Sequence, residues 1–202
     1  MTANPTPRTA RAATADDVDA AVDTITTAFF HDPLWGPAFP DVERRAEQAS
    51  AFWRVFVTSS LRFPWTRVTP KVESVAVWIP PGADELTDEE AGQLEPLLVR
   101  TTGRAVADDI LGLFEQFEAV RPSEPHFYLS LLATHTDHRG AGLGIGLLRD
   151  SLAQIDALGV PAYLESCNPA NDARYQAEGF VPRASFVTPT GHTVTTMWRP
   201  AA

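Results

Sequence analysis

The sequence predicts an α/β domain built on a mixed β-sheet. Segments with apolar residues at helical spacing alternate with short runs rich in β-branched and aromatic residues. One such run, 127–133, leads into a glycine-rich loop and then a helical pattern, as in α/β folds. Near the end, Pro189-Thr190-Gly191 separates two strand-like runs, which indicates an antiparallel hairpin. A length of 202 residues fits one domain, 1–202.

The first part of the chain predicts two helices and three strands. We expect a short strand at 8–13, helices at 18–29 and 42–61, a loop at 34–40, and strands at 65–68 and 72–79. Thr14 and Asp17 have the spacing of a capping box before the first helix. Side chains alternate along a strand, so residues 74, 76 and 78 should share one face and residues 75, 77 and 79 the other. Residues 1–7 contain two prolines and little that can pack, and we expect them to be disordered.

An acidic helical pair separates the two halves of the predicted sheet. We expect these helices at 84–95 and 103–120, and we interpret 84–120 as a helical insertion within the domain. It is compatible with a pocket wall, an interface or a lid. The elements expected after it are a strand at 127–133, helices at 143–158 and 171–177, a strand at 161–165, and a hairpin of 180–187 with 193–198.

Composition restricts the classes of function. The net charge of −10 argues against a nucleic-acid binder, whose surface should be basic. It also means that a polyanionic ligand needs a local positive site, whereas a cationic one is favoured. The sequence contains no run of about 18 apolar residues, so we predict no transmembrane helix. The first eleven residues lack the apolar core of a signal peptide, and the single cysteine, Cys167, allows no intrachain disulfide, which favours a cytoplasmic protein. The five histidines form no metal-ligand spacing, so we predict no metal.

The glycine-rich loop is the strongest local signal. Four glycines, at 140, 142, 144 and 146, lie where a predicted strand passes into a predicted helix. Uncovered backbone N–H groups and the helix N-terminus favour an anion at such a junction. The loop has no lysine for a Walker A motif, and Gly-x-Gly-x-x-Gly fails from both Gly140 and Gly142. What remains is Arg-x-x-Gly-x-Gly, at Arg139, Gly142 and Gly144.

Residues 131–144 resemble the acetyl-CoA signature of the GNAT superfamily of N-acetyltransferases. A second block resembles the same superfamily, from Leu164-Glu165 through Asn168 to Tyr175 and closing with Glu178-Gly179-Phe180. The two blocks cover about the C-terminal third of the chain. Within the superfamily, residues 124–126 and 159–165 are most similar to the puromycin N-acetyltransferase group. One departure is Thr136, where many members have proline.

The resemblance implies a fold and a function. The fold would be a mixed, mostly antiparallel twisted central sheet flanked by helices and splayed between the fourth and fifth strands. The function would be direct transfer of an acetyl group from acetyl-CoA to a primary amine, on a monomer or homodimer. A small, antibiotic-like molecule is the preferred acceptor, and a peptide N-terminus stays open. The alternative is a non-catalytic acyl-CoA-binding sensor or interaction module.

The resemblance also implies cofactor contacts. Backbone groups near the end of the strand would meet the pantetheine arm, with an amide near Ala133 polarising the thioester carbonyl. Amides of the glycine loop would hold the pyrophosphate. The cofactor-binding residues are then Leu132, Ala133, Thr134, Arg139, Gly140, Ala141, Gly142, Leu143, Gly144, Asn168 and Tyr175.

The catalytic candidates are Tyr175, Glu165 and His126. Tyr175 has a phenol suited to protonating a departing thiolate, and it lies seven residues after Asn168, so one short helix could present both. Glu165 ends a strand, where a carboxylate can take a proton from an amine or hold it by charge. His126 is a second candidate base.

The acceptor pocket is predicted from aromatic residues and Glu165. The aromatic candidates are Phe30, Trp35, Phe39 and Trp78, although aromatic residues at such spacing also form cores. Cys167 has no identifiable base partner, so we interpret it as a pocket-wall residue.

Overall fold

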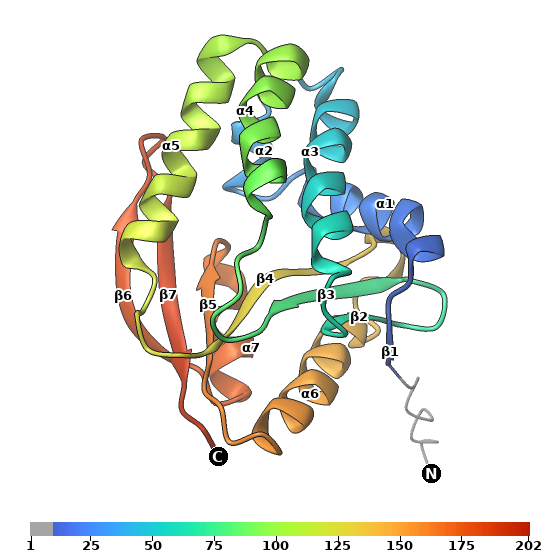
Figure 1. Ribbon diagram of the computed structural model, residues 1–202, viewed down its shortest axis with the longest axis vertical. Helices are drawn as coiled ribbons and strands as arrows, with labels where there is room; N and C mark the ends of the chain where they lie inside the picture. Colours follow the sequence, from blue (N-terminus) through green and yellow to red (C-terminus); the bar gives the residue numbers. More distant parts are fainter. Residues whose placement is uncertain (1–9) are drawn as a thin grey trace.

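The computed structural model describes residues 10–202, which form a seven-stranded sheet with helices on both faces (Figure 1). The strand order is β1-β2-β3-β4-β5-β7-β6, and every neighbouring pair is antiparallel except β4 and β5. The predicted mixed, mostly antiparallel sheet is therefore confirmed. The disorder expected at 1–7 lies outside the described residues. The strands are β1 Arg11–Ala12, β2 Thr66–Val68, β3 Ser74–Ile79, β4 Phe127–Thr134, β5 Ala162–Ser166, β6 Val181–Val187 and β7 Thr193–Arg199.

The helices form two layers. Helices α1 to α5 lie on one side of the sheet, and α6 lies on the other (Figure 1). Their bounds are α1 Val18–Phe29, α2 Trp35–Ala38, α3 Arg45–Ser60, α4 Asp88–Thr102, α5 Arg104–Val120, α6 Leu143–Asp156 and α7 Asp172–Ala177. Short 3-10 turns occur at Ala15–Asp17, Thr136–His138 and Pro169–Asn171.

Strand β3 shows how the sheet divides two hydrophobic cores. Val75 and Val77 belong to the core under α1 to α5, whereas Ala76 and Trp78 belong to the core under α6. The predicted alternation of faces is confirmed. All six residues of β3 are buried, as expected for a central strand covered on both faces.

The sheet opens between β4 and β5. These strands pair only where Phe127 faces Ala162 and Tyr128 faces Tyr163. Just beyond, Val77 of β3 pairs with Leu131 and Trp78 pairs with Leu129, so Ser130 is an extra residue in β4. Such a bulge bends its strand. The predicted splay between the fourth and fifth strands is confirmed, and beyond the bulge the β5-facing edge of β4 makes no ladder with β5.

Two elements differ from their sequence predictions. Helix α4 starts four residues later than expected, at Asp88, because Thr87 caps it: the N–H of Glu90 donates to Oγ1 of Thr87 at 3.2 Å, and the N–H of Thr87 donates to the Glu90 carboxylate at 2.8 Å. The expected loop at 34–40 contains the short helix α2, whose first turn is capped by Asp32.

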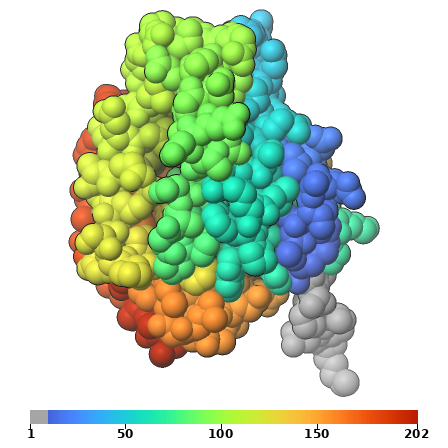
Figure 2. All heavy atoms as spheres, in the orientation of Figure 1, coloured from blue at the N-terminus to red at the C-terminus, as the bar shows by residue number. Residues whose placement is uncertain are grey.

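Helices α4 and α5 form a hairpin that rises from the sheet at the end opposite the described termini (Figure 1). Apolar side chains on its inner side, including Leu98, Ile110 and Phe117, are buried in the first core. In the space-filling view, α3, α4 and α5 cover the upper part of the face turned toward the viewer, and β6 and β7 are visible along one margin (Figure 2). The hairpin is thus packed into the molecule along its length.

Candidate active site

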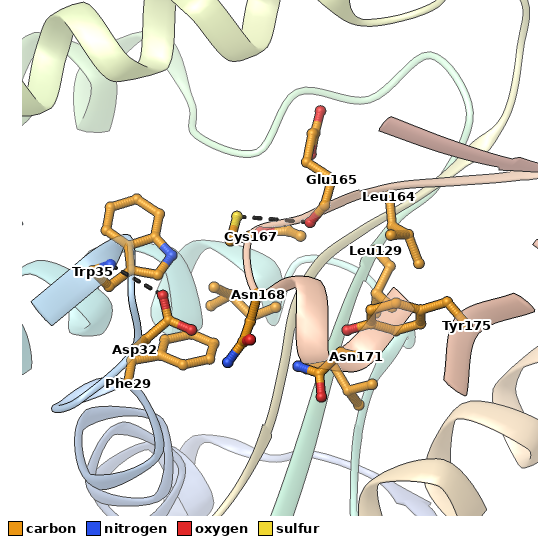
Figure 3. A pocket seen from close by; sticks show the side chains of 13 residues that line it. Phe29, Asp32, Trp35, Leu129, Leu164, Glu165, Cys167, Asn168, Asn171 and Tyr175 are labelled. Carbon is orange, nitrogen blue, oxygen red and sulfur yellow. Dashed lines mark hydrogen bonds between the residues drawn. The ribbon is translucent and has the colours of Figure 1, made fainter. Parts of the chain in front are cut away.

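Two adjoining cavities lie at the splay between β4 and β5. A groove of about 530 Å³ runs from the glycine loop to α7, and a small cavity of about 60 Å³ lies between the separated strands. Figure 3 shows the small cavity and the side chains around it. The residues that line both are Phe29, Asp32, Leu132, Asn168, Asn171 and Tyr175. We call these six residues the shared wall. Because the two cavities meet there, a ligand in the groove can extend to the small cavity.

The glycine loop forms one end of the groove. Gly142 adopts φ +72°, a left-handed conformation that favours glycine, and precedes the first turn of α6. A Cβ on Gly144 would lie only 2.8 Å from Oγ1 of Thr134, so only glycine lets α6 approach β4 this closely. The N–H groups of the first helical turn have no partner within the helix. Nearly all the predicted cofactor residues line this groove: Leu132, Ala133, Thr134, Arg139, Gly140, Gly142, Leu143, Gly144, Asn168 and Tyr175.

Arg139 also anchors the loop through its side chain. Its Nη2 donates to the backbone carbonyl of Ala28 at 2.7 Å, near the end of α1. This contact joins the glycine loop to the helix that precedes Asp32. The sequence predicted only a backbone role for Arg139.

The two cavities differ in charge. The groove is lined by two arginines, Arg139 and Arg174, by two histidines, His31 and His138, and by one acidic side chain, Asp32. The small cavity is lined by Asp32 and Glu165, and no arginine, lysine or histidine of the described chain lines it. This basic groove is a local positive site of the kind that a polyanion needs on an acidic protein.

Tyr175 and Asn168 reach the shared wall from different elements. Tyr175 lies in α7, whereas Asn168 lies before it and caps the 3-10 turn, with its Oδ1 accepting from the N–H of Ala170 at 3.1 Å. The expectation that one short helix presents both is therefore wrong, because Asn168 has an extended backbone and precedes the 3-10 turn that leads into α7. Burial, with nearby Cys167 and Asp32, raises the pKa of Tyr175, so the phenol stays protonated at neutral pH.

Glu165 has a carboxylate shielded from solvent. Its Oε1 is inaccessible and has no hydrogen-bond partner among residues 10–202. The side chain extends away from Tyr175 (Figure 3). Burial raises the pKa of Glu165 to about 7, opposed by the charge of Arg121 and by the hydroxyls of Tyr128 and Tyr163. A carboxylate that titrates near neutral pH can accept a proton from an amine.

Asp32 is a wall residue that the sequence did not reveal. Its Oδ1 accepts from the N–H groups of Leu34, at 2.9 Å, and Trp35, at 3.1 Å. No side chain or backbone group of the described residues hydrogen-bonds to Oδ2. Burial raises the pKa of Asp32 above its usual value. The His-Asp-Pro sequence after α1 predicted a helix end but carried no signal for a cavity.

Only one aromatic candidate for the acceptor pocket, Trp35, lines the small cavity. Phe30 lines neither cavity, because its ring stacks against the guanidinium of Arg45 at 5.2 Å, and Phe29 lines both instead. Trp78 is fully buried in the core under α6, on the opposite face of the sheet, and Phe39 is 1% exposed in the first core. The assignments of Phe30, Trp78 and Phe39 to the pocket are corrected accordingly.

His126 lies just before β4 and lines neither cavity. It is packed against Tyr163 and Trp198, and its Nδ1 lies 2.6 Å from the backbone oxygen of Glu124. Burial lowers the pKa of His126. This position does not support it as the base that meets the acceptor. Cys167 lines the small cavity, and burial keeps its thiol protonated by raising its pKa.

Two further features concern the described residues as a set. No group of three or more histidine, cysteine, aspartate or glutamate side chains within 10–202 is arranged to hold a metal ion. Within the same range, no helix combines the length and apolar character needed to cross a membrane.

Solved structures with similar folds are acetyltransferases. A Corynebacterium glutamicum protein described as histone acetyltransferase HPA2 and related acetyltransferase has a TM-score of 0.68 and 26% identity, covering 98% of both chains. Arylalkylamine N-acetyltransferase 2 of Aedes aegypti has a TM-score of 0.63 and 12% identity, covering 96% of this chain and 99% of its own. The polyamine N-acetyltransferase of Drosophila melanogaster has a TM-score of 0.61 and 12% identity, covering 95% of this chain and 99% of its own. No protein-family model matches the chain.

The architecture is that of the GNAT fold, with its parallel β4–β5 pair in an otherwise antiparallel sheet. The similar structures support an acetyltransferase of that superfamily. They do not single out the puromycin N-acetyltransferase group.

Proposed function

We propose that this protein is an N-acetyltransferase that moves an acetyl group from acetyl-CoA to the primary amine of a small molecule. The observation that carries the proposal is the change of charge across one shared wall. A basic groove suits a polyanionic donor, and an adjoining acidic cavity suits a cationic acceptor. The acceptor could belong to the antibiotic-like class that the resemblance to the puromycin group suggests.

The residues that line the groove suit the chemical groups of acetyl-CoA. The N–H groups from Gly140 to Gly144 would hold the pyrophosphate, with Arg174 adding positive charge at the opposite wall, whereas the N–H of Arg139 donates to the carbonyl of Thr136. The edge of β4 beyond the bulge, near Leu132 and Thr134, would pair with the amides of the pantetheine arm, since β5 does not occupy it. Asn168 would contact the same arm. Bound acetyl-CoA would supply an acetyl group activated as a thioester.

Glu165 would be the base. The bound ammonium first gives one proton to Glu165, directly or through water. The neutral amine then attacks the thioester carbonyl carbon, a C–N bond forms, and a second proton leaves nitrogen as the C–S bond breaks. A backbone N–H of β4 near Ala133 would stabilise the charge that develops on the carbonyl oxygen. Asp32, which lines both cavities, would hold the cationic acceptor at the wall.

Tyr175 would assist the leaving group. When the C–S bond breaks, the electron pair stays on sulfur, and the phenol of Tyr175 donates a hydrogen bond to that sulfur. The ammonium gives up two protons in all: one passes through Glu165 to solvent, and one is matched by the proton that the departing thiolate takes up, so the transfer balances. Burial raises the pKa of Tyr175, which is already higher than that of a thiol. Tyr175 would therefore act mainly as a hydrogen-bond donor to the sulfur while negative charge develops on it.

The test is release of free CoA thiol from acetyl-CoA by purified protein across a panel of primary amines, with mass spectrometry of the acetylated product. The panel should contain diamines, arylalkylamines, aminonucleosides and a peptide with a free N-terminus. Amine-dependent release is expected. Binding of acetyl-CoA with no release for any amine would favour the sensor, and no binding at all would contradict both functions.

A further inference from the structure

The two ends of the α4–α5 hairpin meet beside Glu165. Glu85 precedes α4, and Arg121 directly follows α5. Nη2 of Arg121 lies 3.5 Å from Oε2 of Glu85, and its guanidinium lies 4.2 Å from the ring centroid of Tyr128. The two side chains are only 21% and 13% exposed. This is a largely buried ion pair, placed against the strand next to the candidate base.

The positive charge of Arg121 acts on both Glu85 and Glu165. Arg121 contacts Glu85 directly, whereas Oε1 of Glu165 has no hydrogen-bond partner within residues 10–202. Burial raises the pKa of both carboxyls, and each makes the other harder to ionise. The groups acting on Glu165 from the surrounding elements are Arg121 after α5, Glu85 before α4, the hydroxyls of Tyr128 in β4 and Tyr163 in β5, and the thiol of Cys167 after β5.

Resting on the proposed function, we propose that Glu85 is a positioning residue for acetyl transfer: it engages the guanidinium of Arg121 and so leaves the Glu165 carboxylate free to accept the proton from the amine. Without Glu85, Arg121 would have Glu165 as its nearest buried counterion. A carboxylate held in such a pair is a weaker base, because the guanidinium favours its ionised form. The docking of the hairpin thereby sets the strength of the base.

The chain offers a matched control for this inference. Glu118 also pairs with Arg121, with 2.6 Å between Oε1 and Nη1, but its side chain is 64% exposed and screened by water. We therefore compare Glu85→Gln with Glu118→Gln. Each substitution removes one negative charge from the same guanidinium at nearly constant shape.

The first measurement is the titration of Glu165 itself. Carbon-13 NMR of protein labelled at the glutamate carboxyl carbons follows this group, assigned by the signal missing in Glu165→Gln. We expect Glu85→Gln to lower the pKa of Glu165 by about one unit or more, and Glu118→Gln to change it by less than about 0.3. Equal titration of Glu165 in wild type and Glu85→Gln would overturn the inference.

The second measurement is the pH profile of kcat/KM with the best acceptor from the amine panel. The acid limb should move to lower pH in Glu85→Gln, and the plateau should fall by roughly three- to tenfold as the base weakens. A fall in rate with an unmoved acid limb would indicate a structural role only. If no amine is acetylated, the proposed function fails, and the NMR titration still decides the role of Glu85.

The double variant Glu85→Gln/Arg121→Gln covers the case in which Glu85→Gln does not fold. It leaves no unpaired guanidinium beside Glu165, so the pKa of Glu165 should lie above the wild-type value. A pKa below the wild-type value in this variant would contradict the role assigned to Arg121.

Discussion

Tyr175 and Asp32 at the shared wall and Glu165 in the small cavity can be tested one at a time, because each has different contacts and a different exposure to solvent. Tyr175 exposes a phenol from α7, Asp32 combines a helix cap with a bare carboxylate oxygen, and Glu165 is shielded from water. A substitution can therefore remove one property and keep the rest of the wall.

Tyr175→Phe tests the leaving-group role. The ring and its packing against Phe180, at 6.2 Å between centroids, should stay in place. Loss of the phenolic hydrogen should lower kcat by about a hundredfold, since the sulfur would leave without a donor. Affinity for acetyl-CoA, measured by calorimetry, should remain within about twofold. Unchanged kcat would rule out Tyr175 as the donor to sulfur.

Asp32→Asn tests the charge at the wall. Asparagine can still accept the N–H groups of Leu34 and Trp35 through Oδ1, so α2 keeps its cap. We expect KM for a cationic amine to rise about tenfold, which corresponds to ~1.4 kcal/mol, with KM for acetyl-CoA unchanged. Asp19→Asn is the control, since Asp19 is 88% exposed on α1. An equal effect of both substitutions would indicate a long-range loss of charge.

At the scale of elements, the contact between α6 and β4 positions the glycine loop. Thr134 is held by Ser74, with 3.0 Å between the two hydroxyl oxygens, and therefore has little freedom to yield to a larger neighbour. Gly144 and Gly146 lie two residues apart in α6, but only Gly144 meets β4. The two glycines thus form an internal comparison.

Gly144→Ala and Gly146→Ala should change stability in opposite directions. In Gly144→Ala the new Cβ would meet Thr134, which we expect to cost about 1–3 kcal/mol in the free energy of unfolding and to weaken acetyl-CoA binding. In Gly146→Ala nothing lies within 4 Å, so better helix propensity should stabilise by up to about 1 kcal/mol. Urea denaturation and calorimetry measure both effects. Stabilisation by both substitutions would show that the contact is not tight.

At the scale of the whole molecule, burying Glu165 couples stability to pH. The reference pKa of a glutamate carboxyl is 4.5, and we use it for the unfolded state; in the folded protein the pKa of Glu165 is about 7. Between these values the folded state binds more protons than the unfolded state, so Glu165 lowers stability as pH rises from about 4.5 to 7. The cost is fully present above pH 7.

Glu165→Gln should therefore stabilise the protein at pH 8 and have little effect at pH 4. At 1.36 kcal/mol per pKa unit, the rise in the pKa of Glu165 corresponds to a gain of at most about 3 kcal/mol in the free energy of unfolding of the variant at pH 8. Denaturation of wild type and variant in urea at both pH values measures the difference, and acetyl transfer should fall in the same variant. A difference independent of pH would mean that the pKa of Glu165 is the same in the folded and unfolded states.

We propose that residues 10–202 act as one domain, because α4 and α5 bury their inner side chains in the core that α1 and α3 share with the sheet. The helical pair at 84–120 is then an integral part of that domain, and Arg121 after its second helix pairs with Glu85 before its first.

Features encoded by neighbouring residues were predictable from the sequence. The glycine loop, the alternation of faces in β3 and the strand–loop–helix unit depend on local spacing, and the structure has all three. Thr87 shows the limit even here: its capping box is local, but the acidic residues from 84 onward also suit a helix N-terminus and predict an earlier start.

Only the tertiary structure decided which side chains share the site. Whether Phe29 or Phe30 faces the cavity depends on how α1 packs, and whether Trp78 lines a pocket depends on which face of the sheet α6 covers. Asp32, Glu85, Arg121 and Glu165 belong to four separate segments, so no local pattern connects them. The sequence by itself determined a candidate anion site, because the backbone amides of one loop suffice for that. The environment of the base required the fold, because burial and charge from distant segments set its pKa.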